Sequence, residues 1–136
     1  MKLPFSLLAF LSCLNLTSNA AAFSEQQFVC ALKTEVKVLD PSEAIPQTQV
    51  KSIDQKYVFT VIGNKGSYIN LYYPDIRGPL TIVSDGLKLT LIERNTSDNL
   101  FIATIFSGKE LGDLHPIIFS LHIDRAQPTQ SFGTCH

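Results

Sequence analysis

The stretch YVFTVIGNKGSYINLYY, residues 57–73, decides the fold of this chain. β-branched and aromatic residues dominate it, and Tyr57, Phe59 and Val61 alternate with the residues between them. Such alternation places one set of side chains on each face of a β-strand, and this composition suits a pleated, half-buried surface. The central Gly63-Asn64-Lys65-Gly66 can supply the positive φ angles of a tight hairpin connection. The stretch therefore predicts two strands joined by a hairpin.

The same alternation recurs outward from this hairpin. It predicts strands near residues 55–62, 67–73, 79–84, 86–94, 100–107 and 116–124, with a further strand between Phe28 and Leu39. Residues 40–54 are predicted to form a linker or a short helical turn, and residues 127–136 a polar, turn-rich tail. Short connections favour antiparallel neighbours. We expect an all-β fold: a single small antiparallel meander of about seven or eight strands, closed as a barrel or folded as a sandwich.

Residues 1–22 have the order of features of a secretory signal peptide. Lys2 is followed by a mostly apolar run from Leu3 to Leu16, and small residues lie at 18–22. The run is shorter than the roughly 20 residues of a spanning helix, and no comparable run follows, so we expect no transmembrane segment in the mature protein. We expect an exported β domain over residues 23–136, secreted or periplasmic after cleavage.

One alternative keeps the chain on a membrane. Leu11-Ser12-Cys13 resembles a bacterial lipobox, in which the cysteine is acylated and becomes the first residue. In a eukaryotic secretory route, Asn95-Thr96-Ser97 would fit the N-glycosylation pattern.

Cleavage would remove Cys13 and leave Cys30 and Cys135, near the two ends of the mature chain. In an oxidising compartment such a pair is normally a disulfide. A redox-active pair favours close spacing such as Cys-x-x-Cys, and these two residues are far apart. We therefore expect one disulfide, which would fasten the tail to the first strand.

Charge and motifs argue against several functional classes. The 136 residues carry a net charge of −1, and neither sign clusters. A nucleic-acid binder would be expected to show a basic stripe, which is missing here, so we expect no nucleic-acid partner. The Gly-x-Ser-x-Gly elbow of many serine hydrolases is missing too. We expect a non-catalytic protein without a cofactor.

Tyr68, Tyr72, Tyr73 and Arg77 form the richest aromatic and polar cluster of the sequence. Tyrosine and arginine are favoured anchors in binding interfaces, so these four residues are a possible binding site. The alternative is structural: Tyr68 and Tyr72 would share one strand face and pack as a cross-strand aromatic ladder.

His115 and His122 are the metal candidates, because Asp113 precedes the first and Asp124 follows the second at a spacing of two. Residues two apart share a strand face, so each pair could contribute to a metal site with a third ligand. The alternatives are a loop ion pair and a solvated strand face. No third ligand has a recognisable spacing, so no metal site is predicted.

The layout of a signal peptide, about 110 residues of β meander and cysteines near both ends resembles that of small periplasmic β-barrel proteins. These include lysozyme inhibitors of the membrane-bound and periplasmic C-type class. Gly66-Ser67-Tyr68 does not reproduce the Ser-Gly loop motif that enters the lysozyme cleft, so no functional residue is carried over.

The predicted function is that of a small exported non-catalytic β-domain, which binds a protein, a glycan or a small apolar ligand, with inhibition as one such role. One alternative is a structural exported protein that forms oligomers. The other is a small secreted hydrolase with a site at Asp113, His115 and His122.

Overall fold

The structure is a computed structural model that describes residues 24–39, 44–45, 47–94, 100–108, 112–122 and 128–136. The predicted signal peptide, Cys13, Asn95 and Asp124 lie outside these residues. No helix in the described part of the chain has the length and apolar character needed to cross a membrane.

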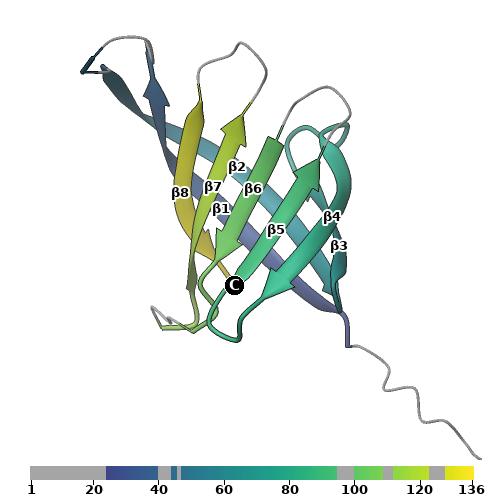
Figure 1. The fold of residues 1–136 in the computed structure, drawn as a ribbon. Coiled ribbons are helices and arrows are strands. Elements are labelled where there is room, and N and C mark those ends of the chain that lie inside the picture. Colours follow the sequence, from purple (N-terminus) through teal and green to yellow (C-terminus); the bar gives the residue numbers. More distant parts are fainter. Residues whose placement is uncertain (1–23, 40–43, 46, 95–99, 109–111, 123–127) are drawn as a thin grey trace, which may run out of the picture.

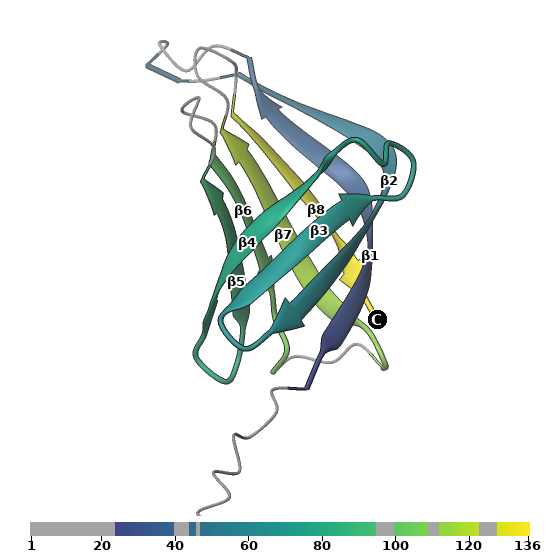
Figure 2. The ribbon, with the colours of Figure 1, turned by 90° about the vertical axis from the view of Figure 1, so that its right-hand side faces the viewer.

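Eight antiparallel strands form a closed barrel (Figures 1 and 2). Each strand pairs with the next along the chain, and the last pairs with the first. The strands are β1 (Gln26–Val38), β2 (Thr48–Ile62), β3 (Lys65–Asn70), β4 (Arg77–Ser84), β5 (Leu89–Arg94), β6 (Leu100–Ile105), β7 (His115–His122) and β8 (Thr129–Cys135). The all-β meander is therefore confirmed, and its closure is that of a barrel.

Two stretches of the sequence were wrongly expected to lack strands. Residues 48–54 belong to β2, where a linker or helical turn was predicted, and residues 129–135 form β8, where a turn-rich tail was predicted. The first stretch pairs with β1 beyond the core, so its side chains are mostly exposed and show no apolar alternation. The second carries mostly small and polar residues, with Phe132 as its one large apolar side chain, and it pairs with both β1 and β7.

The inward-facing residues of the strands make one apolar core. Its largest fully buried side chains include Phe59, Leu32, Leu91, Ile105 and Ile117, each less than 2% exposed. Removing a leucine or phenylalanine side chain from water contributes about 1.5–3 kcal/mol. A cavity lies at one end of the barrel, where β5 and β7 end and β4 and β6 begin, which is the upper end in Figure 1.

A register shift in β1 changes which residues face inward. The pairing with both β2 and β8 slips between Leu32 and Thr34, a β-bulge. Leu32 is buried in the core, and Glu35, only three residues later, lines the inside of the open end. In a regular strand, residues three apart point to opposite faces. The bulge therefore brings Glu35 into the barrel.

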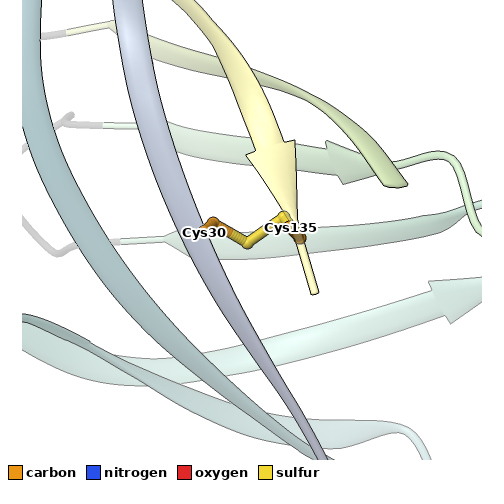
Figure 3. Close-up of a disulfide and its surroundings, with 2 residues drawn as sticks. All are labelled: Cys30 and Cys135. Carbon is orange, nitrogen blue, oxygen red and sulfur yellow. A yellow bond between two sulfur atoms is a disulfide. The ribbon is translucent and has the colours of Figure 1, made fainter. Parts of the chain in front are cut away.

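β1 and β8 form the seam that closes the barrel. Cys30 and Cys135 are register partners there, with Cα atoms 3.9 Å apart, and they form the predicted disulfide (Figure 3). Beyond this bond, Val29 and His136 exchange two backbone hydrogen bonds of 2.9 and 3.1 Å. A Cβ atom at Gly133 would collide with the carbonyl oxygen of Ala31, so glycine permits this close approach.

Candidate functional site

A cavity of about 440 Å³ occupies the open end of the barrel. All eight strands or the connections between them contribute to its wall. The lining residues are Glu35, Gln55, Tyr57, Tyr68, Asn70, Tyr73, Asp75, Ile76, Arg77, Glu93, Phe101, Phe119, Leu121, Thr129 and Ser131. The wall thus combines aromatic rings with charged and amide groups.

Four buried aromatic rings form the inner part of this wall. Tyr68 and Phe101 stack with ring centroids 4.6 Å apart, and Phe101 meets Phe119 edge to face at 4.5 Å. Tyr57 lies 5.3 Å from Phe119. These four side chains are 5–8% exposed, because alternation along β2, β3, β6 and β7 points them into the barrel. Mutual packing of this kind holds the rings in fixed orientations.

The Tyr68 hydroxyl donates a hydrogen bond of 2.6 Å to the Glu93 carboxylate. Burial is the main reason why the pKa of Tyr68 lies far above its usual value, and the hydrogen bond to Glu93 and the charge of Glu93 raise it further. Gly78 makes room for this carboxylate, since a Cβ atom there would collide with Glu93 Oε1. Among the residues that the structure describes, no lysine or arginine forms an ion pair with Glu93.

A second carboxylate, Glu35, forms an ion pair of 2.8 Å with Lys51. The Glu35 side chain is only 17% exposed, whereas that of Lys51 is 54% exposed. The register partner of Glu35 on β8 is Ser131, a polar residue that is 4% exposed and also lines the cavity. Glu35 therefore presents a largely desolvated acceptor next to a small hydroxyl group.

Asn70 is the most buried polar residue of the wall, at 1% exposure. Its Oδ1 atom accepts hydrogen bonds from the backbone N–H groups of Tyr72 and Tyr73, at 2.9 and 3.0 Å. These two donors fix the orientation of the amide, so the other atom must be the NH2 group. That Nδ2 atom is closed off from solvent and from the cavity, and it has no partner of standard hydrogen-bond geometry within the described residues. The amide interacts instead with the neighbouring Tyr57 hydroxyl.

The Asn70 amide also lies beside Tyr57, its register partner on β2. Burial raises the pKa of the Tyr57 hydroxyl, the Asn70 amide opposes this rise, and the charge of Glu35 adds to it. The hydroxyl donates to Gln55 Oε1 at 3.2 Å. The Asn70 amide and the Glu35 carboxylate therefore both affect the pKa of Tyr57.

The structure brings three of the four predicted binding residues to the cavity. Tyr68 is part of its inner wall, and Tyr73 and Arg77 line its exposed rim. Tyr72 points elsewhere, and its hydroxyl donates to Asp54 Oδ2 at 3.3 Å. The expected ladder of Tyr68 and Tyr72 is wrong, because β3 ends at Asn70 and Tyr72 lies in the following turn.

The two histidines named as metal candidates lie at opposite ends of β7. His115 begins this strand and His122 ends it, a separation of roughly 23 Å at the usual strand rise. They cannot share one ion, and the site proposed for Asp113, His115 and His122 is not assembled. No group of three potential metal ligands occurs among the described residues.

Several cavity residues were missed from the sequence. Asn70 continues the inward series of Tyr68 on β3, and Glu93 continues that of Leu91 on β5. A polar residue at the end of an inward-facing apolar series could therefore have indicated these cavity residues from the sequence. Glu35 had no such signal, because the bulge reverses the facing of β1 just before it.

No family model matches this chain, and no curated protein matches it either.

Proposed function

We propose that this protein is a small exported binding protein that holds one small molecule in the open end of its barrel. The cavity of about 440 Å³ carries this proposal. Small-molecule sites are typically preformed hollows of roughly 300–1,000 Å³, lined by aromatic residues and a few placed polar groups. Eight-stranded barrels have an interior of a size that can hold one small ligand.

The contacts around the cavity favour binding over a structural role. Glu93, in the wall of the cavity, keeps a carboxylate without a cation partner among the described residues. A partly buried carboxylate without a cation costs stability in the empty protein. A bound molecule with complementary polar atoms would offset that cost.

Export is part of the same proposal. The order of charge, apolar run and small residues over residues 1–22 supports a cleaved signal peptide. The Cys30–Cys135 disulfide supports an oxidising compartment. The protein would then act in the periplasm or outside the cell, and it would bind its ligand without converting it.

Native mass spectrometry of the protein exported by its own host tests both parts. The expected mass corresponds to cleavage near residue 22 with a closed disulfide, and to the addition of one small molecule in a fraction of the protein. A mass that includes an acylated Cys13 would contradict release as a soluble protein.

Ligand binding is then tested by NMR on labelled protein, with mixtures of small saccharides, amines, carboxylic acids and apolar compounds. We expect at least one mixture to shift backbone signals around the cavity, with those of the β4–β5 turn at the closed end unchanged. If no mixture shifts the cavity signals, the proposed function is wrong.

A further inference from the structure

We propose that the ligand of this cavity is a small organic cation, a primary ammonium group attached to an apolar body. This inference rests on the proposed function and names the class of molecule that the cavity would hold. It follows from the position of the Glu93 carboxylate, which has no cation partner among the described residues, beside the aromatic rings of the inner wall.

The Glu93 carboxylate lies among the rings of the wall. Its register partner across the β5–β6 ladder is Phe101, and its Oε2 atom accepts the hydrogen bond from the Tyr68 hydroxyl. The rings of Tyr68 and Phe101 stack on each other with centroids 4.6 Å apart. Because the Tyr68 hydroxyl uses its proton for Glu93, its oxygen can still accept a hydrogen bond. A ligand that donates hydrogen bonds would therefore find two acceptors together, the carboxylate and the phenol oxygen.

Among the described residues, Glu93 supplies the one inner charge of the wall that no base offsets. The other acids of the wall are Glu35 and Asp75, and Glu35 forms its ion pair with Lys51 at 2.8 Å. Asp75 and Arg77 are both exposed at the rim, where water and salt screen their charges. The inner wall therefore presents one uncompensated carboxylate, which matches a ligand with a single positive charge.

A cation gains more from this wall than a neutral or an anionic molecule. A hydroxyl group of a neutral ligand could donate a hydrogen bond to Glu93, but it would leave the charge of the carboxylate uncompensated. An ammonium group donates the same kind of hydrogen bond and adds the attraction between opposite charges, which strengthens as water is excluded. A carboxylic acid would be repelled, because it brings a second negative charge next to Glu93.

The aromatic rings favour an organic cation over a metal ion. Tyr57, Tyr68, Phe101 and Phe119 all line the cavity. An ammonium group is attracted to the face of such a ring within about 6 Å of its centroid, and an apolar body packs on the same rings. A metal ion such as calcium needs roughly six to eight oxygen ligands instead. Within the described ranges, potential metal ligands never gather in a group of three.

Three probes of similar shape test the role of charge directly. Phenethylammonium, 2-phenylethanol and phenylacetate each carry a phenyl ring on a short chain, and at pH 7 they are positive, neutral and negative. Each is titrated by NMR into the whole exported protein, and so is glucose as a neutral saccharide. The readout is the dissociation constant from backbone signals of Tyr68, Glu93 and Phe119, with the β4–β5 turn as the unchanged reference. We expect phenethylammonium to bind at least about tenfold more tightly than the other three probes.

A pair of variants tests whether Glu93 is the group that binds the cation. Glu93→Gln keeps the shape of the side chain and an oxygen acceptor for the Tyr68 hydroxyl but loses the charge. It should weaken the binding of phenethylammonium about tenfold and leave the binding of 2-phenylethanol unchanged. An altered cavity would instead weaken the binding of both probes. The control Glu25→Gln removes the same charge at an exposed position outside the cavity and should bind as the wild type does.

The outcomes separate this inference from the proposed function. If 2-phenylethanol, phenylacetate or glucose binds as tightly as phenethylammonium, the ligand class is wrong but the binding function stands. The same holds if compounds of another class shift the cavity signals and no amine does. If no compound of any class shifts them, both are wrong. If phenethylammonium binds equally well to the wild type and Glu93→Gln, the assignment of Glu93 as the cation-binding group is refuted.

Discussion

Replacement of both disulfide cysteines in the variant Cys30→Ala/Cys135→Ala should lower the free energy of unfolding by about 4–5 kcal/mol. The bond closes a loop with a sequence separation of 105 residues. In the chain-entropy account, a loop of about 100 residues contributes roughly 4.7 kcal/mol by restricting the unfolded chain. Both side chains are fully buried, so their truncation adds the cost of small voids.

The variant should still fold, because β8 pairs with both β1 and β7 in the absence of the bond. Unfolding in guanidinium chloride, followed by circular dichroism, measures the change. The midpoint should fall by about 1–2 M if the m-value is near the usual range for a domain of this size. Reduction of the wild type should give a similar shift, and reductant should leave the variant unchanged.

A loss below about 1 kcal/mol would refute this reasoning. Such a result would mean that the unfolded chain already keeps its two ends together, so that the bond removes little freedom from it.

Three further predictions concern the core, the seam and a buried hydroxyl. Leu91→Ala, at a fully buried position, should lower the free energy of unfolding by about 2–5 kcal/mol, measured by chemical unfolding. The control Leu87→Ala, at a position 70% exposed, should lower it by about 0.5 kcal/mol or less. Equal losses for the two variants would contradict the assigned core. Gly133→Ala should cost about 1–3 kcal/mol and lower the thermal midpoint, because its methyl group would meet the carbonyl of Ala31; an unchanged midpoint would disprove that contact. Burial and a neighbouring carboxylate raise the pKa of Tyr68 above the usual tyrosine value of about 10. The unfolded chain therefore loses this proton first, and the free energy of unfolding should fall above about pH 10, by at most about 1.4 kcal/mol per pH unit, the limit for one proton. Tyr68→Phe should make that decline shallower, and an identical decline would exclude Tyr68 as its source.

The strands that enclose the core could be predicted because burial of one face imposes alternation on the sequence. Tyr57, Phe59 and Val61 show this pattern, and they are all buried on the inside of β2. The first half of the same strand could not be predicted, because it extends beyond the core and pairs only with β1. β8 was missed because its inward positions carry Ser131 and Gly133, whose small side chains suit a close approach.

The site was only partly accessible to the same reasoning. Tyr68, Tyr73 and Arg77 stood out by residue type, and the fold brings them to one cavity. Asn70 looked unremarkable in the sequence, since a polar residue beside a turn is usually solvated. Glu35 depends on a register shift between neighbouring strands, and pairing registers are a property of the assembled sheet. Local patterns do not contain that information.

The seam between β1 and β8 also imposes an order on assembly. Every other ladder of the barrel joins strands that are consecutive in the chain and can form from local hairpins. The closing ladder joins the two ends of the chain. Contacts of such long range form slowly, because the entropy cost of closing the loop comes before the stabilising contacts form. Until then, β1 keeps one unpaired edge, which can pair with other chains. Oxidation of Cys30 and Cys135 would therefore act as the last step of folding, sealing the edge through which unfinished chains would aggregate.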